Sequence, residues 1–154
     1  MTARSVALIL AISLVFAGCA PVSQPPVADP PLAAGFSRIY FYRTTFSIGS
    51  ESGLFGNVAR PSLSLDGKTV AETPAGSVIF CDVLPGRHEV AVRANQRYTL
   101  DLAAKPDRTH YVKLDWGMGG LTGQGHVTEV AASVGSQDIE GRPRLAATCP
   151  QAGG

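Results

Sequence analysis

The chain has 154 residues, with 13 Lys and Arg against 12 Asp and Glu, and its formal net charge at pH 7 is +1. This length corresponds to one ordinary domain. The near-neutral charge provides no basic field that would gather nucleic acid or anionic lipid headgroups, so composition argues against a nucleic-acid partner, and any attachment to a membrane needs another feature of the chain.

Residues 1–18 are predicted to be a signal peptide. Arg4 precedes the apolar run Val6–Phe16, which is long enough for a signal-peptide core and too short to span a bilayer. The run is followed by Ala17-Gly18-Cys19, and small residues before a cysteine resemble the lipobox of bacterial lipoproteins. That resemblance implies cleavage before Cys19, followed by attachment of acyl chains such as palmitate to the cysteine. The alternative is an ordinary secretory signal that is cleaved elsewhere.

An acylated Cys19 would anchor the protein, because each buried CH₂ contributes about 0.8 kcal/mol and more than one chain holds firmly. In the lipoprotein family an Asp after the cysteine favours the inner membrane. Ala20 occupies this position, so the resemblance implies the outer membrane, with the domain facing the periplasm. The proline-rich stretch 19–35 is predicted to be a semi-rigid tether, because proline removes backbone donors and favours extended conformations.

Two thiols remain if Cys19 is acylated. Cys81 and Cys149 would then lie in an oxidising compartment, which favours a disulfide that ties the C-terminal tail to a central strand. The alternative is a buried Cys81 that packs as a small hydrophobic residue and a free Cys149.

The domain predicted over residues 36–145 consists of short strands. Phe36–Thr45 is apolar on both faces, which is typical of a central strand. Period-two alternation is clearest in Thr109–Trp116. Further strands are predicted at Ser62–Leu65, Thr69–Glu72, Ser77–Val83, His88–Arg93, Arg97–Leu102 and Val127–Ala132. Seven or eight strands without βαβ alternation predict an all-β fold, an antiparallel β-sandwich or a partly open barrel.

The turns and the C-terminus complete this prediction. Asp66-Gly67 is a preferred centre for a tight hairpin, because both residues tolerate positive φ. Leu84-Pro85-Gly86 predicts a second turn, and His88 is placed to brace it through a ring hydrogen bond. Ser136 is expected to cap a short helix that reaches Gly141. Residues 146–154 are predicted to be a flexible tail.

These features resemble a family of bacterial lipoproteins that carry a domain of unknown function, DUF2846. The resemblance covers Arg38 to about Leu145 and depends on Ile39-Tyr40-Phe41-Tyr42-Arg43, Leu65-Asp66-Gly67-Lys68, Pro85-Gly86-Arg87-His88 and Tyr111-Val112. The two turns also look like those of the smaller PEGA surface domains. The resemblance implies an exported β-rich domain and supplies no catalytic residues.

Two glycine-rich stretches, 46–60 and 117–125, are predicted to be loops. Leu54 and Phe55 in the first loop have no alternating apolar partner, so they either fold back onto the core or form an apolar contact for a protein partner. The second loop lacks the Lys and Ser/Thr that end a P-loop, which favours a simple connection over a phosphate site.

No catalytic residue, cofactor or metal site is predicted. Nucleophilic catalysis needs a Ser or Cys on a strained turn beside a base, but the middle residue of the Gly49–Gly53 run is a Glu and Cys81 lies inside a predicted strand. His88, His110 and His126 lack the close spacing of metal ligands. His88 and His110 also alternate in phase with apolar residues, which favours a place at the core.

The sequence therefore favours a non-catalytic outer-membrane lipoprotein whose β domain contacts another envelope protein or stabilises an assembly. The alternative is a module that binds glycan, for example peptidoglycan, or a small ligand. Tyr98, Tyr111 and Trp116 would then form a stacking surface, although core packing explains most such aromatic sets. An envelope hydrolase is a third hypothesis, for which no residue is a candidate catalytic group.

Overall fold

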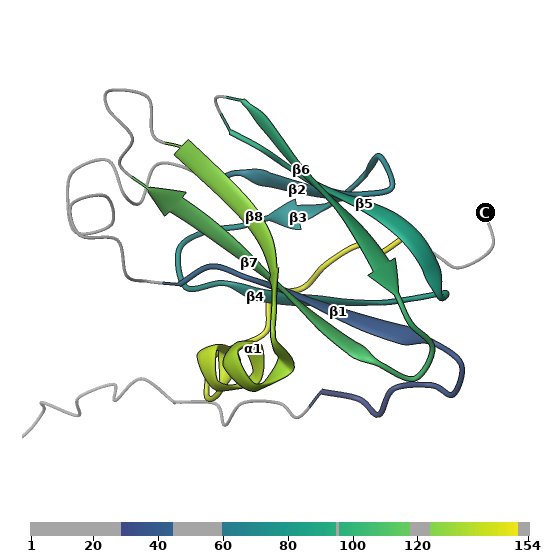
Figure 1. Ribbon diagram of the computed structural model, residues 1–154. Helices are drawn as coiled ribbons and strands as arrows, with labels where there is room; N and C mark the ends of the chain where they lie inside the picture. The colour runs from purple at the N-terminus through teal and green to yellow at the C-terminus, as the bar shows by residue number, and fades with distance from the viewer. Residues whose placement is uncertain (1–28, 45–59, 95, 118–123, 151–154) are drawn as a thin grey trace, which may run out of the picture.

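A computed structural model describes residues 29–44, 60–94, 96–117 and 124–150. The described residues form eight strands and one short helix, and the strands build two four-stranded sheets (Figure 1). The two sheets pack face to face and do not close into a barrel. The predicted all-β sandwich is therefore confirmed, together with a short C-terminal helix.

Sheet A has the strand order β4-β1-β7-β8. Its strands are β4 (Val78–Val83), β1 (Ser37–Tyr42), β7 (Thr109–Gly117) and β8 (Gln124–Val130). All six residues of β1 are buried, which confirms its predicted central position. Strands β1 and β7 pair in parallel, whereas the other pairs of sheet A are antiparallel. Burial on both faces is the usual environment of a parallel pair, and this pair is the exception to the antiparallel arrangement that the sequence predicts.

Sheet B has the strand order β3-β2-β5-β6, and all its pairs are antiparallel. Its strands are β3 (Lys68–Glu72), β2 (Ser62–Leu65), β5 (Gly86–Arg93) and β6 (Arg97–Ala104). The predicted hairpin turn at Asp66-Gly67 joins β2 to β3. Six of the eight strand predictions agree with the observed bounds to within two residues at both ends, because alternating hydrophobicity and turn residues specify both limits.

The core lies between the two sheets, where alternate residues of each strand point inward. Sheet A contributes Ile39 and Phe41 from β1, and both side chains are fully buried. The other main members of this cluster are Leu63, Leu65, Ile79, Cys81, Val90, Val92, Leu102, Val112 and Leu114. Burial of this many aliphatic side chains is the main source of stability in a domain of this size.

The outer face of sheet A carries a second, smaller cluster that the helix covers. Tyr40 and Tyr42 point to this face, and Ile139 of α1 (Ala132–Ile139) packs with them. Gly135 lies directly on the ring of Tyr111, where an added Cβ would come within 2.2 Å of a ring carbon. The helix can therefore approach the sheet this closely only with glycine at that position.

Two predicted bounds near the C-terminus are wrong. The helix begins at Ala132, with Ala131 as its N-cap and no side-chain cap, whereas Ser136 lies inside it and its hydroxyl donates to the carbonyl of Ser133. Contact with the sheet positions this helix, which outweighs the local capping preference of serine. Strand β8 begins at Gln124 within the glycine-rich stretch, because this part of the chain pairs with the end of β7.

The last residues of the predicted tether are attached to sheet A. The Asp29 carboxylate accepts a hydrogen bond from the Tyr40 hydroxyl at 2.7 Å and pairs with Arg144 at 3.0 Å. The Pro30 carbonyl accepts from the Arg38 guanidinium at 2.6 Å, and the same guanidinium pairs with Asp82. The part of the chain that follows Asp29 is thus fixed on the outer face of sheet A.

The two long sides of the sandwich, where an edge of sheet A faces an edge of sheet B, differ. We call the side between β3 and β4 the sealed side, because the C-terminal segment 144–149 runs along it (yellow in Figure 1). The amide of Leu145 donates to the Val78 carbonyl of β4, and that of Thr148 donates to the Val70 carbonyl of β3. We call the side between β6 and β8 the open side.

Candidate functional site

A cleft of about 670 Å³ lies on the open side of the sandwich. It lies between the end of β6, the start of β7 and the junction of β8 with α1. Its lining residues include Lys105, Arg108, Thr109, His110, Glu129 and Ala131. Pockets of 300 to 1,000 Å³ are the usual size for ligand sites, so this cleft is large enough to hold more than a single ion.

His110 links two of the segments that line this cleft. Its Nε2 accepts a hydrogen bond from the backbone N–H of Lys105 at 3.2 Å, and its Nδ1 lies 2.7 Å from Oε1 of Glu129. Because one ring nitrogen accepts and the other donates to a carboxylate, this geometry corresponds to the neutral ring with its proton on Nδ1. Both nitrogens are occupied, so His110 connects the β6–β7 turn to β8 and is not a free base.

Two cationic side chains of the cleft have no ionic partner among the described residues. Lys105 and Arg108 are exposed, and the ion pairs among the described residues include neither. The backbone of Arg108 is fixed, because its carbonyl accepts hydrogen bonds from the Arg38 amide at 2.9 Å and the Ser37 hydroxyl at 3.1 Å. The cleft thus presents positive charge from a turn that is tied to β1.

The remainder of the open side is filled by side chains. The ring of Tyr98 in β6 covers Gly125 of β8 so closely that a Cβ at Gly125 would come within 2.8 Å of it. Leu100 and Val127 are half-buried against the core between these strands. Among the described residues, side chains thus fill the open side where Tyr98 meets Gly125, and the cleft lies beside the start of the helix.

A second, smaller hollow of about 290 Å³ lies on the outer face of sheet B. Its lining includes Ser62, Ser64, Thr69, Arg93 and Arg97. The Ser64 hydroxyl donates to the Ala91 carbonyl at 3.3 Å, and Arg97 forms an ion pair with Glu89. Hydroxyl and guanidinium groups dominate this hollow, which gives it hydrogen-bonding chemistry suited to sugar hydroxyls or a carboxylate.

The predicted turn residues form one structural unit. Asp66 and Gly67 have φ values of 52° and 76°, and Gly86 has a φ of 152°, so the turns use backbone conformations that favour glycine or Asp. His88 connects the two turns: its Nε2 lies 2.8 Å from the Leu84 carbonyl and its Nδ1 lies 2.7 Å from the Asp66 carboxylate. Since both partners accept, a ring that makes both bonds carries two protons. Pro85 is exposed in the second turn.

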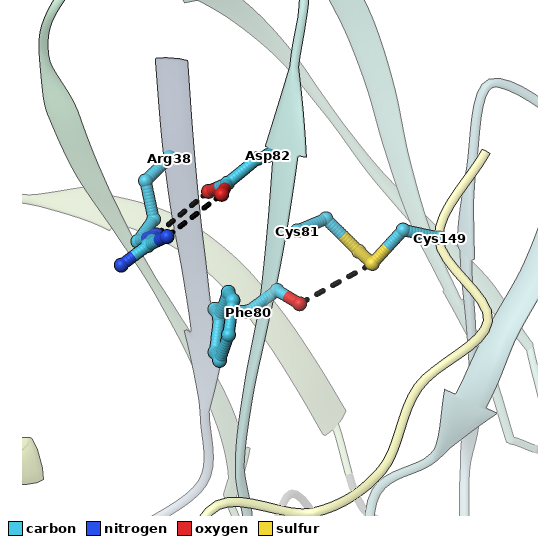
Figure 2. The surroundings of a disulfide bond; sticks show 5 residues. All are labelled: Arg38, Phe80, Cys81, Asp82 and Cys149. Atoms are coloured by element: carbon cyan, nitrogen blue, oxygen red, sulfur yellow. Dashed lines mark hydrogen bonds and ion pairs between the residues drawn. A yellow bond between two sulfur atoms is a disulfide. The ribbon is translucent and has the colours of Figure 1, made fainter. Parts of the chain in front are cut away.

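Cys81 and Cys149 are joined by a disulfide with a Cα–Cα distance of 5.5 Å (Figure 2). Cys81 lies in β4 and is completely buried, and Cys149 lies in the segment that covers the sealed side. Its Sγ lies 3.2 Å from the carbonyl oxygen of Phe80. Residues 146–150 of the predicted flexible tail are therefore held against the domain, and neither cysteine is a free nucleophile.

The tyrosines of the outer face of sheet A are packing residues. Tyr40 and Tyr111 stack with ring centroids 5.4 Å apart, and the Tyr42 hydroxyl donates to Asp138 at 2.8 Å. Burial raises the pKa of all three phenols, and the hydrogen bonds to Asp29 and Asp138 add to this for Tyr40 and Tyr42. Tyr111 lies under the helix and is not part of an exposed stacking surface.

Several predicted site residues lie outside the residues that the structure describes. These are the lipidation residue Cys19 and the candidate contact residues Leu54 and Phe55. Within the described ranges, no group of three or more His, Cys, Asp or Glu residues is placed to hold a metal ion. The described helix is also too short to cross a membrane.

Sequence analysis did not identify the cleft. The Lys105-Pro106-Asp107 turn is recognisable from its proline, but its neighbours Glu129 and Ala131 lie more than 20 positions further along the chain. Only the pairing of β7 with β8 brings them together. The two cationic residues of the turn, Lys105 and Arg108, are a weak signal that could have drawn attention to it.

Comparison with known proteins gives one match. The sequence model of a family described as "Protein of unknown function (DUF2846)" matches residues 33–126. No curated protein and no solved structure matches the chain. The matched residues include β1 and both predicted turns, which are the positions that carry the resemblance to this family in the sequence.

Proposed function

This chain belongs to the DUF2846 family, and from that premise we propose that it is a non-catalytic cell-envelope lipoprotein whose sandwich binds another envelope protein. The observation that carries the proposal is the difference between the two sides of the sandwich. The sealed side is covered by the C-terminal segment and a disulfide. The open side keeps a cleft of about 670 Å³, and this is the surface where we expect the partner to bind.

Two features support a place in the envelope. A disulfide between Cys81 and Cys149 is stable in an oxidising compartment such as the periplasm. The Ala17-Gly18-Cys19 motif provides an acylation site, and Ala20 favours the outer membrane. The lipid on Cys19 would hold the domain at the periplasmic face of that membrane. Anchoring in this way concentrates the domain near its partners and needs no basic surface to attract it to the membrane.

The non-catalytic character of the proposal is supported by the state of the reactive side chains. Both ring nitrogens of His88 and of His110 are used in hydrogen bonds that join segments of the fold. Cys81 is bonded to Cys149. Groups that already make structural bonds are poor general bases or nucleophiles, because using them would break those bonds.

A glycan-binding role is the second candidate, and the hollow on the outer face of sheet B favours it. Hydroxyl groups of Ser62, Ser64 and Thr69 line it beside Arg93. These groups match the hydroxyls and carboxylates of peptidoglycan. If this candidate holds, purified cell wall retains the chain, and Arg93→Ala weakens that retention while changes in the open-side cleft do not.

The test of the first candidate is lysine-reactive crosslinking in intact cells, followed by mass spectrometry of the crosslinked peptides. Lys105 in the cleft and Lys68 in β3 are both exposed, so they form a matched pair. We expect crosslinks to one protein through Lys105 and few through Lys68. Equal capture through both residues would contradict partner binding at the open side. So would the absence of crosslinks through Lys105 in a chain that purified cell wall retains.

A further inference from the structure

We propose that the open-side cleft recognises a carboxylate group of the partner protein, such as an acidic side chain or a chain terminus. This inference rests on the proposed function, according to which the ligand of the cleft is a protein. It adds the chemistry by which the cleft would recognise that ligand.

The charges of the cleft leave an unbalanced positive pair. Glu129 is the one carboxylate among the lining residues, and it interacts with the ring of His110. Lys105 and Arg108 have no anionic partner among the described residues, so the lining carries a net positive charge. A metal cation would be repelled here, whereas a carboxylate would gain two opposite charges within one hollow.

The nearest carboxylate in sequence faces elsewhere. Asp107 lies between the two cations in the turn, but its Oδ1 accepts a hydrogen bond from the Gly35 amide at 2.7 Å. The Asp107 amide in turn donates to the Phe36 carbonyl at 2.8 Å. Asp107 therefore fastens the turn to the segment before β1, and Lys105 and Arg108 remain available to a ligand.

The turn that carries both cations is held at several points. His110 accepts from the Lys105 amide, and the Arg108 carbonyl accepts from the Arg38 amide. A binding group on a fixed turn loses less conformational freedom when its ligand arrives, so less of the interaction energy is lost.

The size of the cleft and the shape of its cationic groups indicate the class of ligand. The planar guanidinium of Arg108 matches a carboxylate in a two-bond geometry, and the Lys105 ammonium can add a third donor. The Thr109 hydroxyl, also in the lining, can donate or accept. A hollow of about 670 Å³ holds the side chain that carries the carboxylate together with its backbone, which fits a protein segment better than a free ion.

The test measures binding to the full chain in non-ionic micelles of N-acetylglutamate α-amide, whose one charge is the side-chain carboxylate, and of its uncharged analogue N-acetylglutamine α-amide; we call them acetylglutamate and acetylglutamine. Backbone amide shifts of Thr109, His110 and Ala131 report occupancy of the cleft. We expect millimolar binding of acetylglutamate, and at least fivefold weaker binding of acetylglutamine. The double variant Lys105→Gln with Arg108→Gln should weaken acetylglutamate binding about tenfold, because it removes both positive charges of the lining while each exposed charge pair contributes only modestly.

The matched control is Lys68→Gln with Arg87→Gln, which removes the same charge from exposed positions of sheet B. This control should bind acetylglutamate within twofold of the unchanged chain. Equal shifts from the two acetylated amino acids, or equal loss in both double variants, would overturn the carboxylate assignment. Binding of inorganic phosphate tenfold more tightly than acetylglutamate would also overturn it, in favour of a phosphate site.

The two proposals fail separately. If the cleft variant is still linked to its protein partner in cells through a photo-reactive group on β8, the partner contact stands and carboxylate recognition is wrong. If acetylglutamate binds as expected but crosslinking through Lys105 finds no protein, the anion site stands and the protein partner is wrong. Thermal unfolding of both double variants, expected to match the unchanged chain, shows that neither result comes from loss of the fold.

Discussion

The sealed and open sides of this sandwich differ in what covers the edges of the two sheets. On the sealed side, backbone bonds from Leu145 and Thr148 and the Cys81–Cys149 disulfide attach the C-terminal segment across both sheets. On the open side, side chains fill one end and the other end remains a basic cleft. From this difference we expect stability to depend on one side of the domain and the proposed recognition on the other. Changes on the sealed side should cost stability, and changes in the cleft should cost binding.

The largest effect is expected from removing the disulfide. The bond joins cysteines 68 positions apart, and crosslinks of this span contribute about 2–4 kcal/mol to the free energy of unfolding. Cys81→Ala with Cys149→Ala should therefore lower that free energy by this amount in urea titrations. The unchanged chain under reducing conditions should lose a similar amount, and reductant should not affect the double variant. A loss below about 0.5 kcal/mol in both experiments would mean that the disulfide on the sealed side contributes little to stability.

Gly135→Ala tests whether the helix is fixed on sheet A. An added Cβ would come within 2.2–2.6 Å of the Tyr111 side chain, and overpacking of this kind costs about 1–3 kcal/mol. The adjacent Ser136→Ala is the control, because Ser136 is exposed and should change the free energy of unfolding by no more than about 0.5 kcal/mol. Equal melting temperatures for the two variants would show that the helix packs more loosely than described.

Asp29→Asn tests the attachment of the chain before β1. Asp29 is 15% exposed and bonds both Tyr40 and Arg144, and hydrogen bonds to charged groups contribute about 1.5–3 kcal/mol when they are well shielded. We expect a loss of about 1–2 kcal/mol in chemical unfolding. Asp101→Asn, at an exposed position of β6, should have almost no effect. If both variants unfold alike, residues 29–36 do not stabilise the domain.

Stability should also fall at high pH because of the buried tyrosines. Burial raises the pKa of Tyr40, Tyr42 and Tyr111 in the folded state, so above the ordinary tyrosine pKa of about 10 the unfolded chain loses these protons first. The contribution is complete below that pH and is lost as pH rises through the folded pKa values. Urea titrations at pH 8, 10 and 11, with phenolate absorbance as a second observable, measure it. Constant stability over this range would contradict the burial of these phenols.

The smallest effect is expected on the open side. Glu129→Gln removes the charge that faces His110, but the glutamate side chain is 45% exposed, and such pairs contribute less than about 1 kcal/mol. The melting temperature should therefore hardly change. The same variant should strengthen binding of acetylglutamate in the cleft, since it removes the only negative charge of the lining. Weaker binding would mean that Glu129 holds the ligand and does not repel it.

Strand positions could be predicted from the sequence because local patterns determine them. Alternation in Thr109–Trp116 and the two-sided apolar character around Phe41 identify β7 and β1, and Asp66-Gly67 marks the first hairpin. The parallel pairing of β1 with β7 was not predictable in this way. It depends on which strands meet in space, and the two strands are separated by five others in the chain.

The position of the helix and the presence of the cleft likewise could not be predicted from local sequence patterns. Ser136 suggested a cap, but the contact of Gly135 with Tyr111 decides where the helix lies. The cleft combines the Lys105–Arg108 turn with Glu129 and Ala131, which only the sheet brings together. The sequence left open whether Cys81 and Cys149 form a disulfide. An oxidising compartment with two remaining cysteines favours the bond, but the sequence does not give the distance between them.

The most direct test of the separation between the two sides uses a photo-reactive amino acid at one of two matched positions. Thr128 in β8 and Thr148 in the C-terminal segment are both exposed threonines, the first on the open side and the second on the sealed side. With the reactive group at position 128, illumination of intact cells should link the chain to one partner protein, and the link should be lost with Lys105→Gln and Arg108→Gln. At position 148 no such adduct should form. A strong adduct from position 148 and none from position 128 would contradict the assignment of the open side as the binding surface.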